Sequence, residues 1–448
     1  MFRVADFFLL LLAIFSTLAD VTLHDPFYCY AEDPIRSWTP LGGIHSPYEP
    51  NRGQIINANV STCEPSKFWL LGRHGARLPL DTEFPNIFGT ITTIHRQIIT
   101  NYNQGRTSLC ASDFELLNNW QFNPNITLDI AGHLAHTGWN EVEALAQRYQ
   151  AAFPSILSST YSADHFTFRS TNFQRTEFSL RAFADGLFGV NAHEQVRFDD
   201  IPEPDIFMRP YQNCPLYTQI NAVRVEQDAF LQGPEYQQMT VQVSAKLGFH
   251  NSNVLRIGEV AAIALQCKLE QIWDSNFTSP FCAAFSVANA QVIEYSEDVD
   301  WYYRIGYGRP EYRQLYENLM CFHIQDMLRF IQSPDVNKAR IMSGHVNLFL
   351  ILMHFDAFDD DLPLTRHNFA QQMQRVWKSS DHLPMAANLA VIQFDCDEGD
   401  NDLLFLYNEK PLLVPGCDSN GVCKQSLIFQ RFSRYLNANC MEVYCTNE

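Results

Sequence analysis

The stretch Leu70–Pro79, LLGRHGARLP, decides the fold, because a short apolar run ends there in a histidine set between two arginines. Phe68–Leu71 is apolar, aromatic-rich and bounded by a glycine, which predicts a buried strand that ends where Arg73, His74 and Arg77 begin. Ligands of open α/β sheets bind outside the carboxyl ends of the strands. A neutral imidazole can attack phosphorus, and guanidinium groups beside it can hold phosphate oxygens bidentately. The stretch therefore indicates phosphate chemistry at a strand end.

Two later segments repeat this arrangement. His165–Arg169 alternates, with Phe166 and Phe168 on one side, which predicts a half-buried strand that brings Arg169 to its carboxyl end. Ala339–Met342 predicts another strand, which leads through Ser343 and Gly344 to His345 and an apolar helix. Arg73, His74, Arg77, Arg169 and His345 could together form a compact cationic pocket.

Between these strands, apolar residues recur at helical spacing. Helices are expected at Thr92–Ile99, at Asn140–Phe153, from a cap at Thr176 through Phe188 to an exit at Gly189, at Val260–Trp273 and at Tyr312–Ile331. Leu389–Phe394 suits a buried strand, and Leu403–Tyr407 with Pro411–Val414 resembles a hairpin. The expected fold class is α/β, a sheet flanked by helices with a mainly helical inserted domain. The expected division is a signal peptide at 1–19, an irregular arm at 20–66, a discontinuous core at 67–190 and 335–448, and the helical insertion at 191–334.

The composition is that of a globular protein, with 46% hydrophobic, 13% aromatic and 18% charged residues in 448. That length suggests two domains or one with a large insertion. The formal net charge is −19 and no basic block occurs, which argues against a nucleic acid partner. A polyanionic substrate must then be captured by a local arginine cluster, against a field that salt screens within about 10 Å.

The first 19 residues resemble a secretory signal, with Arg3 before the apolar run Phe7–Phe15 and small residues Thr17 and Ala19 at the cleavage positions. The apolar run is shorter than the ~20 residues that span a bilayer, so no membrane anchor is expected after cleavage. Secretion or residence in the lumen of the secretory pathway follows. Three sequons, at Asn59, Asn125 and Asn276, fit a glycosylated surface.

The 12 cysteines are even in number and, behind a signal peptide, favour disulfides over metal ligands. Cys417 with Cys423, and Cys440 with Cys445, are close enough in sequence to close small loops. His133 and His136 are spaced as metal ligands could be, but no third ligand is evident and a solvated or packed pair is the better interpretation. No metal and no cofactor are expected.

The three strand-end segments resemble the histidine acid phosphatases, the high-molecular-weight branch of the histidine phosphatase superfamily that includes phytases. The segments FRSTNFQRTEFSLRAFADGLFG (Phe168–Gly189), PDIFMRPYQNCPLY (Pro204–Tyr217) and EDVDWYYRIGYG (Glu297–Gly308) are similar to the multiple inositol polyphosphate phosphatases. The resemblance runs from about Phe68 to Cys445. It implies an α/β sheet domain interrupted by a helical one.

The resemblance also implies roles for single residues. The RHGxRxP motif of the family falls on Arg73 to Pro79, which makes His74 the nucleophile that becomes phosphohistidine and places Arg73 and Arg77 on the phosphate. Arg169 matches a third phosphate-binding arginine, whereas Arg175 is expected to be a scaffold residue. His345 matches a second histidine that contacts the phosphoryl group.

One position departs from the family pattern. Relatives carry a carboxylic acid after the second histidine, which protonates the leaving alcohol, but this chain reads His345-Val346-Asn347. An asparagine amide cannot give up a proton at any relevant pH. General acid catalysis contributes about 10²–10⁴ in rate, so the loss should be felt. Conceivable substitutes are His345 as an imidazolium, a carboxylate of the Asp359–Asp361 run, or a neighbouring phosphate of the substrate.

Three hypotheses for function follow. The leading one is a phosphomonoesterase that acts on a small anionic substrate, an inositol polyphosphate such as phytate, through phosphohistidine at His74. The second is a catalytically impaired pseudophosphatase that binds phosphate esters, motivated by Asn347. The third is a phosphatase that prefers leaving groups needing little protonation, such as phenols.

Overall fold

The computed structural model describes residues 24–34, 37–359, 362–397 and 399–447. Within them the chain forms a mixed sheet with the strand order β2-β3-β1-β4-β5-β6, and β7 pairs with β5. The strands are β1 (Glu64–Arg73), β2 (Phe166–Ser170), β3 (Ala339–Gly344), β4 (Asn388–Asp395), β5 (Asp402–Tyr407), β6 (Lys410–Pro411) and β7 (Val422–Lys424). Strands β2, β3 and β1 are parallel, and β4 runs antiparallel to β1. The expected α/β class is confirmed.

Strand β1 lies in the middle of the sheet, and its side chains are buried on both faces. Phe68 and Leu70 belong to the core on one side of the sheet, and Trp69 and Leu71 to the core on the other. This is the alternation that a strand imposes when both faces are covered. The strand is longer than the sequence predicted, because its first residues extend to the surface while only its second half is apolar.

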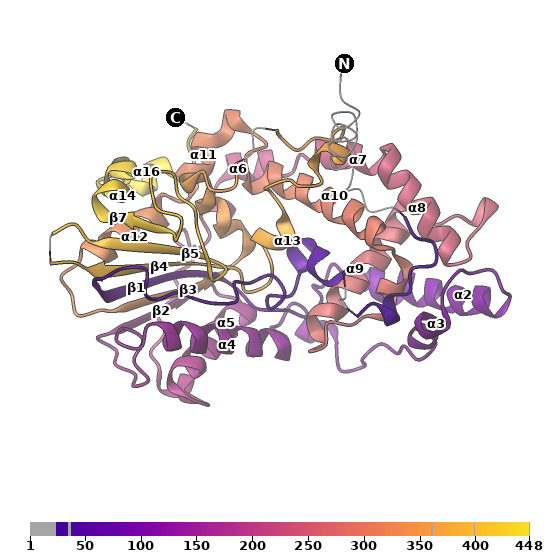
Figure 1. Ribbon diagram of the computed structural model, residues 1–448, viewed down its shortest axis with the longest axis horizontal. Coiled ribbons are helices and arrows are strands. Elements are labelled where there is room, and N and C mark those ends of the chain that lie inside the picture. Colours follow the sequence, from indigo (N-terminus) through magenta and orange to yellow (C-terminus); the bar gives the residue numbers. More distant parts are fainter. Residues whose placement is uncertain (1–23, 35–36, 360–361, 398, 448) are drawn as a thin grey trace, which may run out of the picture.

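Helices α4 (His136–Ala152) and α5 (Gln174–Phe188) cover one face of the sheet and pack on each other (Figure 1). Val142, Leu145, Leu180 and Phe183 join the sheet residues in one apolar core, which confirms both helices. Helix α5 starts before the expected cap at Thr176. The Thr176 hydroxyl lies 2.9 Å from the Thr171 and Phe173 carbonyls, so it serves the turn before the helix and does not cap it. Gly189 ends α5 at φ +101°, as expected from its freedom in that region.

The middle of the chain is helical within the described residues (Figure 1). Its α-helices are α6 (Pro215–Asn221), α7 (Val225–Leu231), α8 (Pro234–Lys246), α9 (Ile257–Trp273), α10 (Val287–Ile305), α11 (Arg313–Leu319) and α12 (Cys321–Gln332). The single helix predicted at Tyr312–Ile331 is therefore wrong, since it breaks at Met320. No glycine or proline marks that break, and Cys321, the first residue of α12, is held by a disulfide. The division of the chain into a core and an insertion stays a prediction.

The remaining elements lie at the ends of the chain and beside the sheet. Before β1, the described part of the arm holds only the short helices η1 (Tyr30–Glu32), η2 (Thr39–Leu41) and η3 (Gly43–His45). Helices α2 (Thr92–Asn103) and α3 (Ala111–Asn118) lie beside the helical half (Figure 1). The predicted hairpin is present, although β6 is only two residues long. The last helices are α13 (Ser379–His382), α14 (Gln425–Arg431), α15 (Ser433–Leu436) and α16 (Cys440–Val443).

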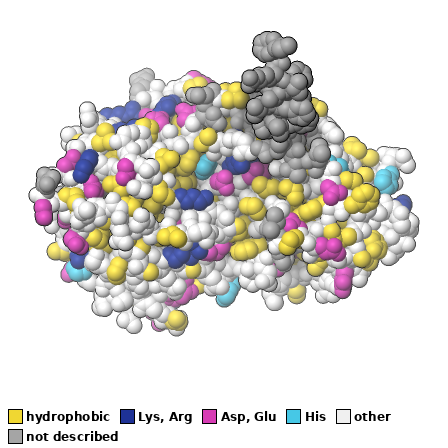
Figure 2. Space-filling model, viewed as in Figure 1, with side chains coloured by type: hydrophobic (Ala, Val, Ile, Leu, Met, Phe, Trp, Pro, Cys, Tyr) yellow, Lys and Arg dark blue, Asp and Glu magenta, His cyan; other side chains and the backbone are white. Residues whose placement is uncertain are grey.

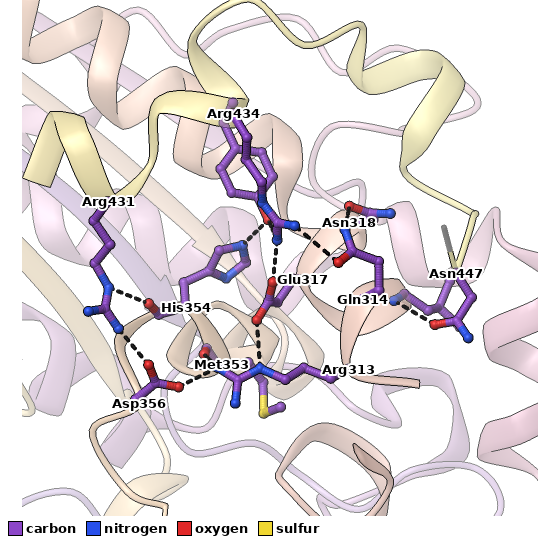
Figure 3. Close-up of polar contacts among 12 residues, drawn as sticks. Arg313, Gln314, Glu317, Asn318, Met353, His354, Asp356, Arg431, Arg434 and Asn447 are labelled. Atoms are coloured by element: carbon purple, nitrogen blue, oxygen red, sulfur yellow. Dashed lines mark hydrogen bonds and ion pairs between the residues drawn. The ribbon is translucent and has the colours of Figure 1, made fainter. Parts of the chain in front are cut away.

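A 3₁₀-helix, η11 (Val346–Phe355), follows β3 directly and carries the sequence after His345. Figure 3 shows the polar contacts that fix its far end. Asp356 accepts hydrogen bonds from Arg313 and Arg431, and Arg431 also donates to the His354 carbonyl. The ring of His354 lies 3.0 Å from the Tyr435 hydroxyl. The C-terminal helices therefore anchor the segment that leaves the predicted site.

All 12 cysteines are paired in six disulfides, Cys29–Cys110, Cys63–Cys396, Cys214–Cys445, Cys267–Cys282, Cys321–Cys440 and Cys417–Cys423. The expected Cys417–Cys423 pair is confirmed. The expected Cys440–Cys445 pair is wrong, because these two cysteines, close in sequence, each bridge to a distant helix segment. Such a set of disulfides is typical of oxidising compartments.

Within the described residues, no helix is long and apolar enough to cross a membrane. The predicted signal peptide, with its cleavage positions at Thr17 and Ala19, lies outside these residues.

Candidate active site

The site forms where the parallel strands end together. Arg73 of β1 pairs with Gly344 of β3, and Ser170 of β2 pairs with Ser343. His74 and His345 therefore leave neighbouring strands at the same edge, with ring centroids 5.7 Å apart. The backbone N–H of His74 donates to the Gly344 carbonyl at 3.0 Å, which ties the two strand ends directly.

His74 is 4% exposed and has the tautomer of a nucleophile. Its Nδ1 lies 2.8 Å from the Gly75 carbonyl, which can only accept, so Nδ1 carries the proton and Nε2 keeps its lone pair. Burial, followed by the charges of Arg73 and Arg175 and the neighbouring His345, holds the pKa of His74 well below its usual value. The imidazole is therefore neutral in the free protein, and Nε2 can attack phosphorus.

The loop after His74 is held by close backbone packing. A Cβ on Gly75 would lie 2.3 Å from the Gly138 carbonyl oxygen, and a Cβ on Gly138 would lie 2.2 Å from the Ala76 carbonyl oxygen. The two glycines let the loop rest on the first turn of α4. The Ser179 hydroxyl of α5 accepts from the Gly75 N–H at 3.0 Å.

Glu141 of α4 holds the same loop through a hydrogen bond to its backbone. Its carboxylate accepts from the Ala76 N–H at 3.2 Å and from the Tyr48 N–H at 3.1 Å, so it joins the loop to the N-terminal arm. Burial raises the pKa of Glu141 to about 7. The two backbone hydrogen bonds favour the ionised form and oppose the rise in pKa that burial causes.

Arg73 and Arg77 flank His74 and are themselves restrained. One terminal nitrogen of Arg73 donates to the carbonyls of Ile44, Leu383 and Pro384. Burial, with the charges of Arg77 and Arg175, lowers the pKa of Arg73 to about 9. Both arginines are buried, and the charge of Arg77 acts on Arg73 beside His74.

Arg77 is bound at its far end to a carboxylate. It contacts Glu83 bidentately at 2.9 and 3.1 Å, and Nη2 also lies 3.3 Å from His45 Nε2. Nη1 also donates to the Leu78 carbonyl at 3.1 Å, so the two terminal nitrogens are fully occupied. Its Nε is the donor left for a phosphate oxygen unless Glu83 moves.

This geometry agrees with the comparisons with known proteins. The model of the histidine phosphatase superfamily (branch 2) matches residues 68–408. The chain belongs to this family. It is 31% identical over 447 residues to multiple inositol polyphosphate phosphatase 1 of Drosophila melanogaster, covering 97% of this chain and 93% of that protein. It is 25% identical to the protein of the same name from Homo sapiens, covering 89% and 87%.

Solved structures share the fold. The phytase from D. castellii superposes with a TM-score of 0.69 at 16% identity, covering 92% of this chain and 88% of that one. The Bifidobacterium longum multiple inositol polyphosphate phosphatase, in complex with inositol hexasulfate, gives a TM-score of 0.61 at 12% identity, covering 90% and 98%. Relatives named as inositol polyphosphate phosphatases, in a family of phosphatases, support a phosphomonoesterase.

Arg169 lies near the end of β2, and the carboxylate of Asp205 balances its charge. Its Nη2 contacts Asp205 at 2.8 Å, and its Nη1 donates to the Ser170 carbonyl at 2.7 Å. A phosphate would have to share this guanidinium with Asp205. The role of Arg169 in phosphate binding stays a prediction.

Two further arginines lie on the side of His345: Arg175, which was expected to be a scaffold residue, and Arg209, which sequence reasoning missed. Arg175 Nη2 lies 3.5 Å from His345 Nδ1, and the guanidiniums of Arg175 and Arg209 each lie 4.7 Å from the centre of the Phe173 ring. That ring stands edge-on to His345 at 5.1 Å. The signal was available, because both arginines occur in the segments similar to the inositol polyphosphate phosphatases.

His345 is neutral in the free protein. Burial and then the charges of Arg175, Arg209 and Arg73 hold the pKa of His345 well below its usual value. Nδ1 faces the Arg175 donor and Nε2 lies 3.0 Å from the Thr171 hydroxyl, so the tautomer that suits both contacts carries its proton on Nε2. An imidazolium at His345 would require the negative charge of a bound phosphate. Its role as a proton donor stays a prediction.

Asn347 lies in the first turn of η11, half-buried, and its side-chain amide donates to the Tyr217 hydroxyl of α6 at 3.1 Å. Tyr217 in turn donates to the Arg304 carbonyl at 3.2 Å. The side chain of Asn347 is thus fixed by a residue of α6. The alternative acid Asp359 is exposed, and Asp360 and Asp361 lie outside the described residues.

The sequon residues Asn59, Asn125 and Asn276 are all exposed, as glycosylation would require.

Proposed function

We propose that the chain is a secreted or lumenal phosphomonoesterase that hydrolyses inositol polyphosphates through a covalent phosphohistidine at His74. The observation that carries the proposal is the state of His74, a neutral imidazole with Nδ1 tied to Gly75 and Nε2 available, among arginine side chains. Six disulfides and exposed sequons support the oxidising compartment.

The cationic residues support a substrate with several phosphates. Arg73 and Arg77 flank the nucleophile from one strand end, and Arg175 and Arg209 lie on the His345 side. On the face shown in Figure 2, by contrast, acidic and basic side chains are interspersed. This local cluster would hold a polyanion against the net charge of −19.

Catalysis would proceed in two displacements. Nε2 of His74 attacks phosphorus as the bond from phosphorus to the alcohol oxygen breaks, and the arginines balance the charge on the phosphoryl oxygens. Water then attacks the phosphohistidine, which returns His74 and releases inorganic phosphate. The Gly75 carbonyl holds the Nδ1 proton throughout and stabilises the cationic ring of the intermediate.

A second candidate, a pseudophosphatase that binds phosphate esters without efficient turnover, is favoured by Asn347. That side chain has no proton to give and spends its amide on Tyr217. The third candidate, a phosphatase for aryl esters, shares the same observation.

Phosphate release from phytate and from p-nitrophenyl phosphate, measured from acidic to neutral pH on the secreted protein, separates the three. We expect release from both esters and none from a His74→Ala variant. Release from the aryl ester alone would favour the third candidate. Binding of phytate without release from either ester would establish the pseudophosphatase.

A further inference from the structure

The departing alcohol oxygen needs a proton, because an alkoxide is a poor leaving group. Three carboxylates lie near the arginines of the site, and each is engaged. Glu83 is bound bidentately by Arg77, and Asp205 accepts from Arg169 and from the Met208 N–H. Glu141 accepts from the Ala76 and Tyr48 N–H groups. Asn347 cannot supply a proton. Besides His345 and the phosphates of the substrate itself, this leaves a buried side chain with an O–H or N–H bond as a proton source.

Tyr211 carries such a group. It lies in η7 (Pro210–Gln212), is 4% exposed, and its hydroxyl has no hydrogen-bond partner among the described residues. It lies within electrostatic reach of Arg209, Tyr217, Arg175 and Asp205. Tyr217 is the residue that accepts from Asn347, and Arg175 is the residue that contacts His345. Tyr211 also follows Arg209 by two residues, and the Arg209 guanidinium packs on the Phe173 ring that stands against His345.

Three polar atoms of residues near Tyr211 are likewise buried without a hydrogen-bond partner within the described part of the chain. They are Nε of Arg209, Nε of Arg175 and Oδ2 of Asp205. Buried polar groups are rarely left in this state, since each one costs stability. A cluster of them beside one site is expected where a ligand supplies the missing partners.

We propose that Tyr211 is a catalytic residue, which donates its phenolic proton to the leaving alcohol oxygen of the substrate. This inference rests on the proposed function. As His74 Nε2 forms its bond to phosphorus and the phosphorus–oxygen bond breaks, the electron pair of that bond stays on the alcohol oxygen and takes the Tyr211 proton. The tyrosinate then takes a proton from the water that attacks phosphohistidine, so every atom and charge is returned.

The electrostatic setting suits this exchange. Burial raises the pKa of Tyr211, and the charges of Arg209 and Arg175 oppose that rise. The hydroxyl therefore keeps its proton at any working pH until the leaving oxygen gains charge. The two guanidiniums then stabilise the tyrosinate.

The test compares leaving groups. In Tyr211→Phe, we expect kcat on phytate to fall on the order of 10²-fold, the usual contribution of a general acid. On p-nitrophenyl phosphate, whose phenol needs little protonation, kcat should be nearly unchanged. The matched control is Tyr295→Phe, which removes a buried hydroxyl bonded to the Thr365 carbonyl and to Asn368. It should leave the ratio of the two rates as in the native protein.

A second variant separates chemistry from structure. Adding Asn347→Glu to Tyr211→Phe supplies a carboxylic acid after His345, and we expect it to restore much of the phytate rate. Equal losses on both esters, or no loss on phytate, would overturn the role of Tyr211 while leaving the proposed function intact. A native protein that releases phosphate from neither ester would overturn the proposed function and this inference with it.

Discussion

Acid should weaken the fold through His323, a histidine of α12 that the proposed chemistry does not use. It is fully buried, stacks on Phe207 with ring centroids 4.9 Å apart, and neither ring nitrogen has a hydrogen-bond partner among the described residues. Burial lowers its pKa to about 3. In the unfolded chain the pKa of a histidine is about 6.5.

The direction of the effect follows from proton uptake. Between these two pKa values the unfolded chain binds a proton that the native protein does not, so stability falls as the pH falls below about 6.5. At 1.36 kcal/mol for each pH unit, the loss from pH 7 to pH 5 is about 2 kcal/mol from this residue alone. The loss continues until the pH approaches the native pKa near 3.

The perturbation is His323→Phe, which keeps an aromatic ring on Phe207 and removes the titrating group. Urea unfolding at pH 5 and pH 7, with the disulfides intact, gives the free energy of unfolding at each pH. We expect the difference between the two values to shrink by about 2 kcal/mol relative to the native protein. Replacing the exposed His367 with Gln should leave the difference unchanged. An unaltered difference in His323→Phe would refute the reasoning.

Four other substitutions test the site. Arg175→Ala should weaken competitive inhibition by inorganic phosphate on the order of 10- to 100-fold, as expected for a lost charged hydrogen bond. Arg169→Ala should weaken the inhibition less, because Asp205 already balances the charge of Arg169. A larger effect of Arg169→Ala than of Arg175→Ala would restore Arg169 as the phosphate ligand. Gly75→Ala should abolish turnover, because its Cβ would lie 2.3 Å from a backbone oxygen, and full activity would show that the loop can move. Asn347→Glu should leave the phytate rate of the native protein nearly unchanged, because Tyr211 already supplies the proton, and a gain on the order of 10²-fold at acidic pH would mean that the native protein lacks an efficient acid.

The strand-end arrangement could be predicted from the sequence because it depends on local patterns. Alternation in Phe166–Arg169 and the apolar run before Gly72 define β2 and β1, and parallel strands bring their ends to one edge. Helices α4 and α5 could be predicted for the same reason, because their apolar residues recur at helical spacing. The positions of His74 and His345 were therefore within reach of the sequence.

What the sequence could not supply is the identity of partners far along the chain. Arg169 and Arg175 lie in one sequence segment that does not distinguish them. In the structure Arg169 pairs with Asp205, 36 residues later, whereas Arg175 contacts His345. The tie between Asn347 and Tyr217 spans 130 residues. Spacing predicted the Cys417–Cys423 pair but failed for Cys440, which bridges to α12 and not to its near neighbour.

The central claim is a covalent bond between phosphorus and His74. The most direct measurement is a rapid alkaline quench of the protein during turnover of ³²P-labelled substrate, followed by mapping of the labelled peptide. The proposed chemistry predicts label on the peptide that contains His74, stable to alkali and lost in acid, and none in His74→Ala. Turnover without labelled protein, or label that persists in His74→Ala, would contradict it.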